Sequence, residues 1–170
     1  MAAHYGATAG GCPYCNIMLF KRLQKNAVPD GEEGRAIRER FKNDGTCLHC
    51  GKCCHQGFIV GSRFILIPEL PCKYLVSNGN GDYKCEVYEK REAVEWCNPC
   101  NEKTVKQGLF PPDCAYVQGI VNYEGKTPSP DEDREKVRKA LRKRVKYMPR
   151  PDYIRARDWS NFLKSLYEDK

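Results

Sequence analysis

The sequence of 170 residues contains no apolar run near the roughly 18 residues that a membrane-spanning helix needs. Charged residues make up 30% of it, which is typical of a soluble protein. Residues 1–11 are small and polar, and they lack the positive start and the apolar core of a secretory signal. We therefore expect a protein without a membrane span that resides in the cytoplasm, where thiols are kept reduced.

Histidines and familiar catalytic motifs are also scarce. The chain has three histidines, His4, His49 and His55, and it shows no serine triad, phosphate-binding loop or dinucleotide fingerprint. No pair of carboxylates stands out as an acid and a base. His49 and His55 flank a cluster of cysteines, and with so many thiols nearby we favour hydrogen bonding over metal ligation for both. The sequence leaves open whether the protein is an enzyme.

Cysteine, in contrast, is abundant, with 11 in the chain. Because this number is odd, the thiols cannot all pair as disulfides within one chain, and a reducing compartment opposes such bonds. Four of them lie within eight residues, in Cys47-Leu48-His49-Cys50-Gly51-Lys52-Cys53-Cys54. Thiols at two-residue spacing can turn toward one centre in a tight turn, so this run predicts a metal or iron–sulfur site.

Further cysteines follow in the contexts Pro-Cys, Cys-x-x-Tyr, Trp-Cys-Asn-Pro-Cys and Pro-Pro-Asp-Cys-Ala-Tyr, up to residue 114. Together with the first cluster, over residues 46–123, they resemble the CxxCxxCC family, which is described as zinc- or iron-chelating proteins and sometimes as Fe–S oxidoreductases. The resemblance implies eight cofactor-binding cysteines: Cys47, Cys50, Cys53, Cys54, Cys72, Cys85, Cys97 and Cys114.

The chain departs from the family pattern near the seventh of these cysteines. The family usually has Arg-Pro shortly before it, whereas Arg91 is not followed by proline here. Cys100 is an additional thiol, so either Cys97 or Cys100 is the counterpart of the family's residue. Both remain candidate metal ligands.

Cys12 and Cys15 lie outside the resemblance. The tetrapeptide Cys12-Pro13-Tyr14-Cys15 repeats the glutaredoxin active-site sequence. A thioredoxin-like fold needs a strand before that motif, and the eleven residues that precede it read as a loop. We therefore expect Cys12 and Cys15 to join Cys100 in a further metal centre, or else to be a free thiol pair.

The number of cysteines bears on the kind of cofactor. Zinc and iron–sulfur centres typically take four protein ligands, so eight cysteines predict two four-thiolate centres or one polynuclear centre. We expect the adjacent side chains of Cys53 and Cys54 to diverge and to serve two centres, or two irons of one cluster. This favours iron–sulfur, with [4Fe-4S] as the leading cofactor, while zinc is the alternative.

The predicted fold is α+β, a small, irregular, cysteine-rich domain organised by metal, with flanking helices and a C-terminal helical hairpin. Residues 1–45 form a tail with helices at 16–26 and 32–41, the latter with Ala36 and Ile37 on its apolar face. Residues 46–127 form the cysteine domain, and residues 128–170 form the helical hairpin.

Within the cysteine domain, the β-branched run 58–67 predicts one or two strands that end before Pro68. The turn residues 78–82 predict a hairpin, residues 89–96 a helical turn or two, and residues 97–127 a series of turns. In the C-terminal piece, Ser129 and Glu132 predict a capping box. A second helix is expected over 152–167.

The C-terminal piece is strongly basic. Residues 134–157 hold eleven Lys or Arg and two acids, so this piece carries more than the whole net charge of +7. Its first helix, with Val137, Leu141, Val145 and Met148 on one face, binds an acidic protein surface or nucleic acid, or is only a solvated face. Because no aromatic residues interleave the charges, stacking on single strands is not indicated, and we favour a protein partner.

These features predict an iron–sulfur or zinc protein that acts as an electron-transfer or accessory subunit of a larger redox or metalloenzyme-maturation complex. The alternative is a structural zinc module that mediates protein or nucleic-acid interactions. A third hypothesis is an enzyme that uses a cluster, because flagellin lysine N-methylases are similar to this family in the cysteine motif. It ranks last, since the chain has little room for a methyl-donor domain.

Overall fold

The computed structural model describes residues 25–97 and 99–168. The fold is mixed α and β, as predicted, with two small sheets and a helical C-terminal region. Cys12, Cys15 and almost all of the helix predicted at 16–26 lie outside the described residues. Among the helices of the described ranges, none is long and apolar enough to cross a membrane.

The main sheet has the strand order β1-β2-β5. Strands β1 (His55–Val60) and β2 (Arg63–Pro71) are antiparallel, and β5 (Lys126–Thr127) pairs in parallel with the start of β2. The prediction that a strand ends before Pro68 is wrong. The register jumps from Gly57 opposite Leu66 to His55 opposite Pro71, so Pro68 falls in an irregular stretch where its missing N–H breaks no ladder bond. Strand β5 was not predicted.

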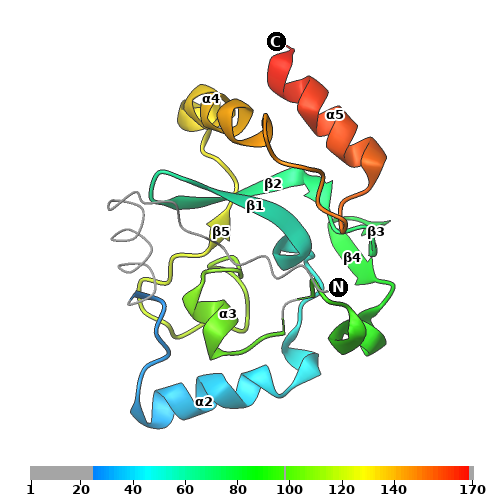
Figure 1. Ribbon diagram of the computed structural model, residues 1–170. Coiled ribbons are helices and arrows are strands. Elements are labelled where there is room, and N and C mark those ends of the chain that lie inside the picture. The colour runs from blue at the N-terminus through cyan, green and yellow to red at the C-terminus, as the bar shows by residue number, and fades with distance from the viewer. Residues whose placement is uncertain (1–24, 98, 169–170) are drawn as a thin grey trace, which may run out of the picture.

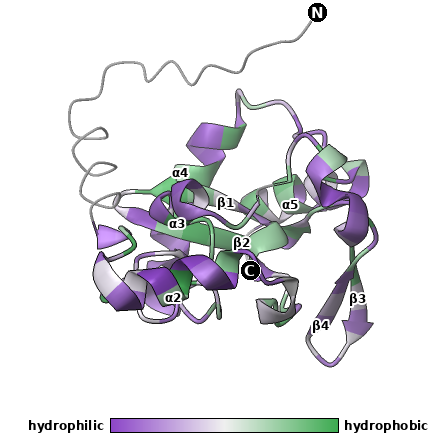
Figure 2. Cartoon of the chain, turned by 90° about the horizontal axis from the view of Figure 1, so that it is seen from below, coloured by the Kyte–Doolittle hydropathy of each residue, from purple (hydrophilic) through white to green (hydrophobic). Residues whose placement is uncertain are grey.

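The predicted hairpin is confirmed by β3 (Leu75–Gly79) and β4 (Asp82–Cys85), which pair antiparallel. Its two loop residues, Asn80 and Gly81, have φ angles of 52° and 84°, the left-handed conformation that two-residue hairpin loops require. Figure 2 shows the hairpin projecting from the body, with mainly hydrophilic residues toward its loop. Only its base, at Leu75, is buried.

The C-terminal helices pack on the main sheet. Helix α4 (Arg134–Val145) contacts β1, and α5 (Ala156–Tyr167) contacts β2, so both lie on the same side of the sheet (Figure 1). The predicted helix face is confirmed by one apolar cluster that the helices share with the strands. Its buried members are Phe58, Ile65, Ile67, Leu70, Val137, Leu141, Val145, Ile154, Trp159, Phe162 and Leu166.

Two details of this region differ from the predictions. The capping box does not form, because the Ser129 hydroxyl donates to the carbonyl of Pro130 (3.1 Å) and a 3₁₀ turn, Asp131–Asp133, precedes α4. The last helix begins at Ala156, not at residue 152. Ile154, fully buried, instead forms an isolated antiparallel bridge with Cys72, which ties the C-terminal region to the cysteine region.

A second apolar cluster lies on the other side of the sheet, around α2 (Gly31–Phe41) and α3 (Glu102–Lys106) (Figure 1). The predicted helix 32–41 is confirmed, but Ala36 is exposed while Ile37 is fully buried. Helix α3 was not predicted within the turn-rich region. Its start is fixed by Asn101, whose side chain accepts from the backbone N–H of Thr104 (3.0 Å).

Candidate metal centre

In the cysteine run 47–54, residues 47–51 form no regular element and lead into a 3₁₀ helix, Lys52–Cys54. His49 and Gly51 both have positive φ angles, 51° and 67°. A side chain at position 51 would place its Cβ 2.8 Å from Cγ of Tyr83, so glycine is required there by both backbone conformation and space. The carbonyl of Gly51 accepts from the backbone N–H of Cys54 and from Nδ1 of His55, each at 2.9 Å.

Four thiols gather where this run meets the two sheets, and we call them the strand group: Cys54, Cys72, Cys85 and Cys97. Backbone hydrogen bonds set their positions, because the N–H of Cys72 donates to the carbonyl of Cys54 (2.9 Å). Cys85 at the end of β4 pairs with Leu75, whose N–H in turn donates to the carbonyl of Cys72 (2.9 Å).

The pKa values of two thiols in the strand group, Cys54 and Cys97, are affected by the charges of other cysteines in the group. The hydrogen bond with Cys53, then burial and the charges of Cys53, Cys85 and Cys72, raise the pKa of Cys54. Burial, followed by the charges of Cys85 and Cys72, raises the pKa of Cys97. A thiol whose pKa is raised by the charges of neighbouring thiolates gains most from a shared cation, such as a metal.

Five thiols form a second set, which includes Cys53 and which we call the loop group: Cys47, Cys50, Cys53, Cys100 and Cys114. Burial, followed by the charges of Cys114, Cys53 and Cys47, raises the pKa of Cys100 to about 12.

Burial also raises the pKa of Cys114 to about 12, with Cys53, Cys50 and Cys47 as its charged neighbours. Burial is again the largest cause at Cys47, whose pKa is raised. Cys97 and Cys100, the two candidates for one family position, thus belong to different groups.

Cys53 and Cys54 join the two groups. Their Sγ atoms lie 3.8 Å apart, so the prediction that these side chains diverge is wrong. The hydrogen bond with Cys54 is the main cause that lowers the pKa of Cys53. Two thiolates on one tetrahedral zinc, with Zn–S bonds of ~2.3 Å, would also lie about 3.8 Å apart.

The thiols are gathered without forming a closed coordination shell. Among the described residues, no three His, Cys, Asp or Glu side chains converge tightly enough to hold one metal ion. The nine cysteines in the described ranges are free thiols, and seven of the eight cysteines implied by the family resemblance are partly buried, Cys53 being exposed.

Three cations border the thiols and fit a negatively charged metal–thiolate centre. Lys52, whose pKa is raised chiefly by its hydrogen bond to Asp113, interacts with the charges of Cys50 and Cys114. Arg91 lowers the pKa of Cys47 and of Cys97, although burial dominates at both thiols.

The third cation is Lys126, which is buried with 4% of its surface exposed. Its Nζ donates to the carbonyls of Cys53 (2.9 Å) and His55 (2.6 Å). Burial lowers its pKa, and the charges of Cys53 and Cys54 oppose that shift. Sequence reasoning missed this residue, because no pattern in the sequence distinguishes an isolated lysine in a two-residue strand from any other lysine.

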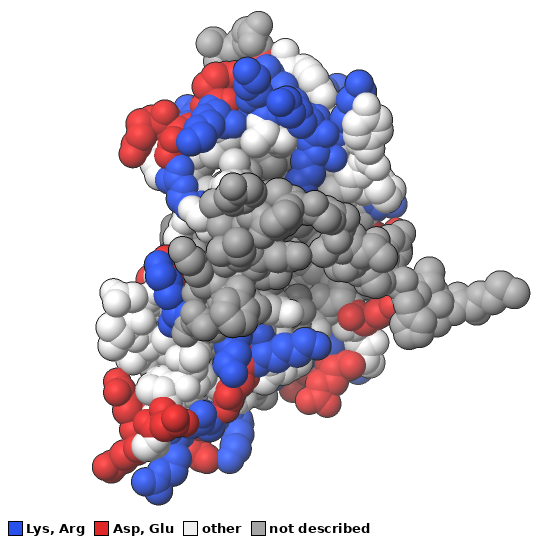
Figure 3. All heavy atoms as spheres, turned by 60° about the vertical axis from the view of Figure 1, so that its left-hand side comes forward, with Lys and Arg blue, Asp and Glu red and all other residues white. Residues whose placement is uncertain are grey.

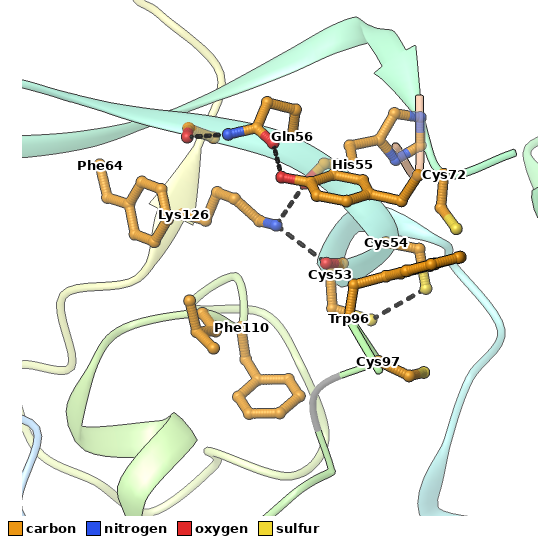
Figure 4. Close-up of a pocket in the computed structure, with 13 residues that line it drawn as sticks. Cys53, Cys54, His55, Gln56, Phe64, Cys72, Trp96, Cys97, Phe110 and Lys126 are labelled. Atoms are coloured by element: carbon orange, nitrogen blue, oxygen red, sulfur yellow. Dashed lines mark hydrogen bonds between the residues drawn. The ribbon is translucent and has the colours of Figure 1, made fainter. Parts of the chain in front are cut away.

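A partly open cavity of about 270 Å³ adjoins the strand group. Figure 4 shows Lys126 extending across it from β5 toward the 3₁₀ helix that carries Cys53 and Cys54, with Phe64, Phe110 and Trp96 around the same space. The hydroxyl of Tyr153 donates to Gln56 Oε1, and Gln56 Nε2 donates to the carbonyl of Gly57 (2.7 Å).

The two histidines next to the cluster are engaged with tyrosine rings. The ring of His55 is perpendicular to that of Tyr83, and the ring of His49 is tilted against that of Tyr88, each with centroids 5.6 Å apart. Burial is the main cause that lowers the pKa of His55, so its ring is neutral at pH 7. The hydrogen bond of His55 to Gly51 agrees with a supporting role for this side chain.

Comparisons with protein-family models, with curated proteins and with solved structures found no match to this chain. Membership of the CxxCxxCC family therefore stays a prediction that rests on the cysteine pattern.

Proposed function

We propose that the chain binds iron–sulfur through the thiols of the strand group and the loop group, and that it acts as an electron-transfer or accessory subunit of a larger redox or metalloenzyme-maturation complex. The carrying observation is that two sets of thiols, far apart in sequence, meet at the adjacent pair Cys53 and Cys54. When bound, an iron–sulfur cluster supplies one-electron redox chemistry.

The surroundings of the thiols support a polynuclear centre. Cys53 of the loop group and Cys54, Cys72 and Cys97 of the strand group border the same cavity, so thiols of both groups meet at one place. Lys52, Arg91 and Lys126 offset the negative charge of ligated thiolates, and such charges raise the reduction potential of a cluster. The free thiols fit the reducing cytoplasm as the site of action.

A structural zinc module is the second candidate, and one distance favours it. The Sγ separation of 3.8 Å between Cys53 and Cys54 equals the spacing of two thiolates on one tetrahedral zinc, about 3.8 Å. In that case the adjacent pair would belong to one zinc site, and the remaining thiols would complete it and a neighbouring one.

The basic helix α4 supports docking onto an acidic protein partner. Figure 3 shows Lys and Arg side chains gathered over the end of the molecule that holds α4. Some of this charge is used internally, because Arg138 donates to the carbonyl of Ser165 (2.7 Å) and Arg144 to that of Ile59 (3.2 Å). The exposed Lys139 and Lys143 remain for a partner.

Anaerobic purification followed by metal and acid-labile sulfide analysis tests the proposal. Iron with an equal amount of sulfide, and a visible absorption band that bleaches on reduction, is the expected result. Zinc without sulfide would refute electron transfer and establish the second candidate.

The adjacent pair is tested by Cys54→Ala, with Cys100→Ala as the matched control. We expect Cys54→Ala to lose about one centre's share of metal, because the strand group then keeps only three of the usual four thiolates. Cys100→Ala should lose less, since the loop group still has four thiols. Unchanged metal content in Cys54→Ala would show that this thiol is not a ligand.

A further inference from the structure

The cavity beside the strand group is also lined by apolar and polar side chains that are not metal ligands. Besides the thiols of Cys53, Cys54, Cys72 and Cys97, its lining includes the aromatic and aliphatic side chains of Phe64, Trp96, Leu109, Phe110 and Tyr153. Hydrogen bonds from Tyr153 to Gln56, and from Gln56 to the carbonyl of Gly57, hold the polar edge of the cavity in place. Ligand pockets typically combine apolar walls with a few fixed polar groups in this manner.

Lys126 supplies a buried positive charge at the edge of this cavity. Its ammonium group has three hydrogens, and in the described part of the chain two of them are donated to the carbonyls of Cys53 and His55. Neither a carboxylate nor a sulfur is among its hydrogen-bond partners there. The charges of Cys53 and Cys54 compensate this buried cation only from a distance, and its third hydrogen, which has no hydrogen-bond partner among the described residues, can be donated to an anion.

The backbone and the Phe64 ring pack closely against the side chain of Lys126 and hold it in position. Gly57 lies beneath the Lys126 stem and the Phe64 ring, where a Cβ would lie 2.7 Å from Lys126 Cδ and 2.3 Å from Phe64 Cε2. The ammonium lies 5.8 Å from the centroid of the Phe64 ring. A glycine inside a strand often marks such a close approach.

We propose that this cavity binds a small aromatic carboxylate, with the carboxylate on Lys126 Nζ and the ring among Phe64, Trp96 and Phe110. One buried cation matches a monoanion, whereas the second charge of a phosphate would be left uncompensated. A volume of about 270 Å³ lies just below the range of drug-sized pockets, ~300–1,000 Å³, and suits a ligand with a single ring. The inference goes beyond the proposed function and does not require a bound metal.

Binding is measured by calorimetry and ligand-observed NMR on the full chain purified anaerobically, with benzoate as the probe and benzamide as its uncharged isostere. Metal and sulfide are measured in the same samples, so the outcome for the metal centre is known independently. We expect a dissociation constant for benzoate on the order of 1 mM or below, and clearly weaker binding of benzamide.

Lys126→Met should weaken benzoate binding about 10–100-fold, the usual worth of a hydrogen bond to a charged group, and abolish the preference for benzoate over benzamide. Lys52→Met is the matched control, since it removes a charge beside the loop group without touching the cavity. Leu109→Trp fills the cavity while keeping Lys126, and it should exclude both probes.

Absence of benzoate binding to the wild-type chain would overturn the proposal, and so would equal binding of benzoate and benzamide. The same holds if Lys126→Met folds and binds benzoate as tightly as the wild type. If that variant fails to fold, Leu109→Trp decides, because benzoate binding that survives filling of the cavity places the ligand elsewhere.

Discussion

The substitution Gly57→Ala is expected to destabilise the protein through one defined overlap. The new Cβ would lie 2.3 Å from Cε2 of Phe64 and 2.7 Å from Cδ of Lys126, well inside the ~3.5–4.0 Å of ordinary carbon contacts. Overpacking of this kind costs about 1–3 kcal/mol of stability. Alanine loses less backbone entropy on folding than glycine does, which offsets about 0.5–1 kcal/mol of that cost. We therefore expect the free energy of unfolding to fall by about 1–2 kcal/mol.

Urea unfolding of the wild type, Gly57→Ala, Phe64→Ala and the double variant tests this as a double-mutant cycle. Because Phe64→Ala removes the ring that the new Cβ meets, the cost of Gly57→Ala should shrink by about 1 kcal/mol in that background. If Gly57→Ala costs nothing, or costs the same in both backgrounds, the packing of Phe64 over Gly57 is not as described. The helix signal in circular dichroism serves as the control for global folding.

Two further predictions concern other parts of the molecule. The hydrogen bond from Arg63 is the main cause that holds the pKa of Asp133 below its ordinary value, so the ionised carboxylate stabilises the fold at neutral pH. Asp133→Asn should therefore lower the free energy of unfolding at pH 7. The difference in this free energy between the variant and the wild type should vanish as the pH falls below ~3.9 and through the folded-state pKa of Asp133. A difference that does not depend on pH would contradict this. In metal analysis, Cys97→Ser should lose about half of the bound metal, since the strand group has only the four thiols that one centre needs. Cys100→Ser should retain most of the metal, because the loop group has one thiol more than four. Equal losses of metal in the two variants would contradict this grouping.

The local fold was predictable where one short segment carries the whole signal. The β-branched run after the cysteine cluster became two strands, and the turn at residues 78–82 became a hairpin whose loop, Asn80 and Gly81, adopts positive φ angles. The apolar spacing of Val137, Leu141 and Val145 correctly predicted the buried face of α4. In each case the hydrophobic period or the turn residue is itself the physical cause of the structure.

Features that depend on distant partners, or on a competing local hydrogen bond, were not predictable. Strand β2 extends past Pro68 because the register between β1 and β2 shifts at that point. The sequence of one strand alone does not show such a shift. The Ser129 hydroxyl has its own local acceptor at Pro130, which displaced the expected cap. Lys126 enters the site only because β5 pairs with the start of β2, a contact between residues about 60 positions apart.

For the site, the cysteine spacing predicted which residues gather but not how. The pattern did not reveal that Cys97 lies with the strand group and Cys100 with the loop group, because that depends on which cysteines, distant in sequence, each thiol meets in the folded chain. It also suggested that Cys53 and Cys54 diverge, whereas the 3₁₀ turn brings their sulfurs to 3.8 Å. Spacing constrains a ligand set, while backbone geometry decides which ligands share a centre.

The positions of the thiols are fixed by the protein's own packing, which bears on what a metal contributes. Two apolar clusters lie on either side of the sheet, and backbone hydrogen bonds anchor Cys54 to Gly51 and Cys72 to Cys54. Small metal domains that unfold without their ion lack such cores. We therefore expect metal removal by a chelator, under anaerobic and reducing conditions, to leave the far-ultraviolet circular dichroism of the chain nearly unchanged while the metal-dependent absorption disappears. Loss of the helical signal together with the metal, reversed when metal is restored, would instead show that the centre holds the fold together.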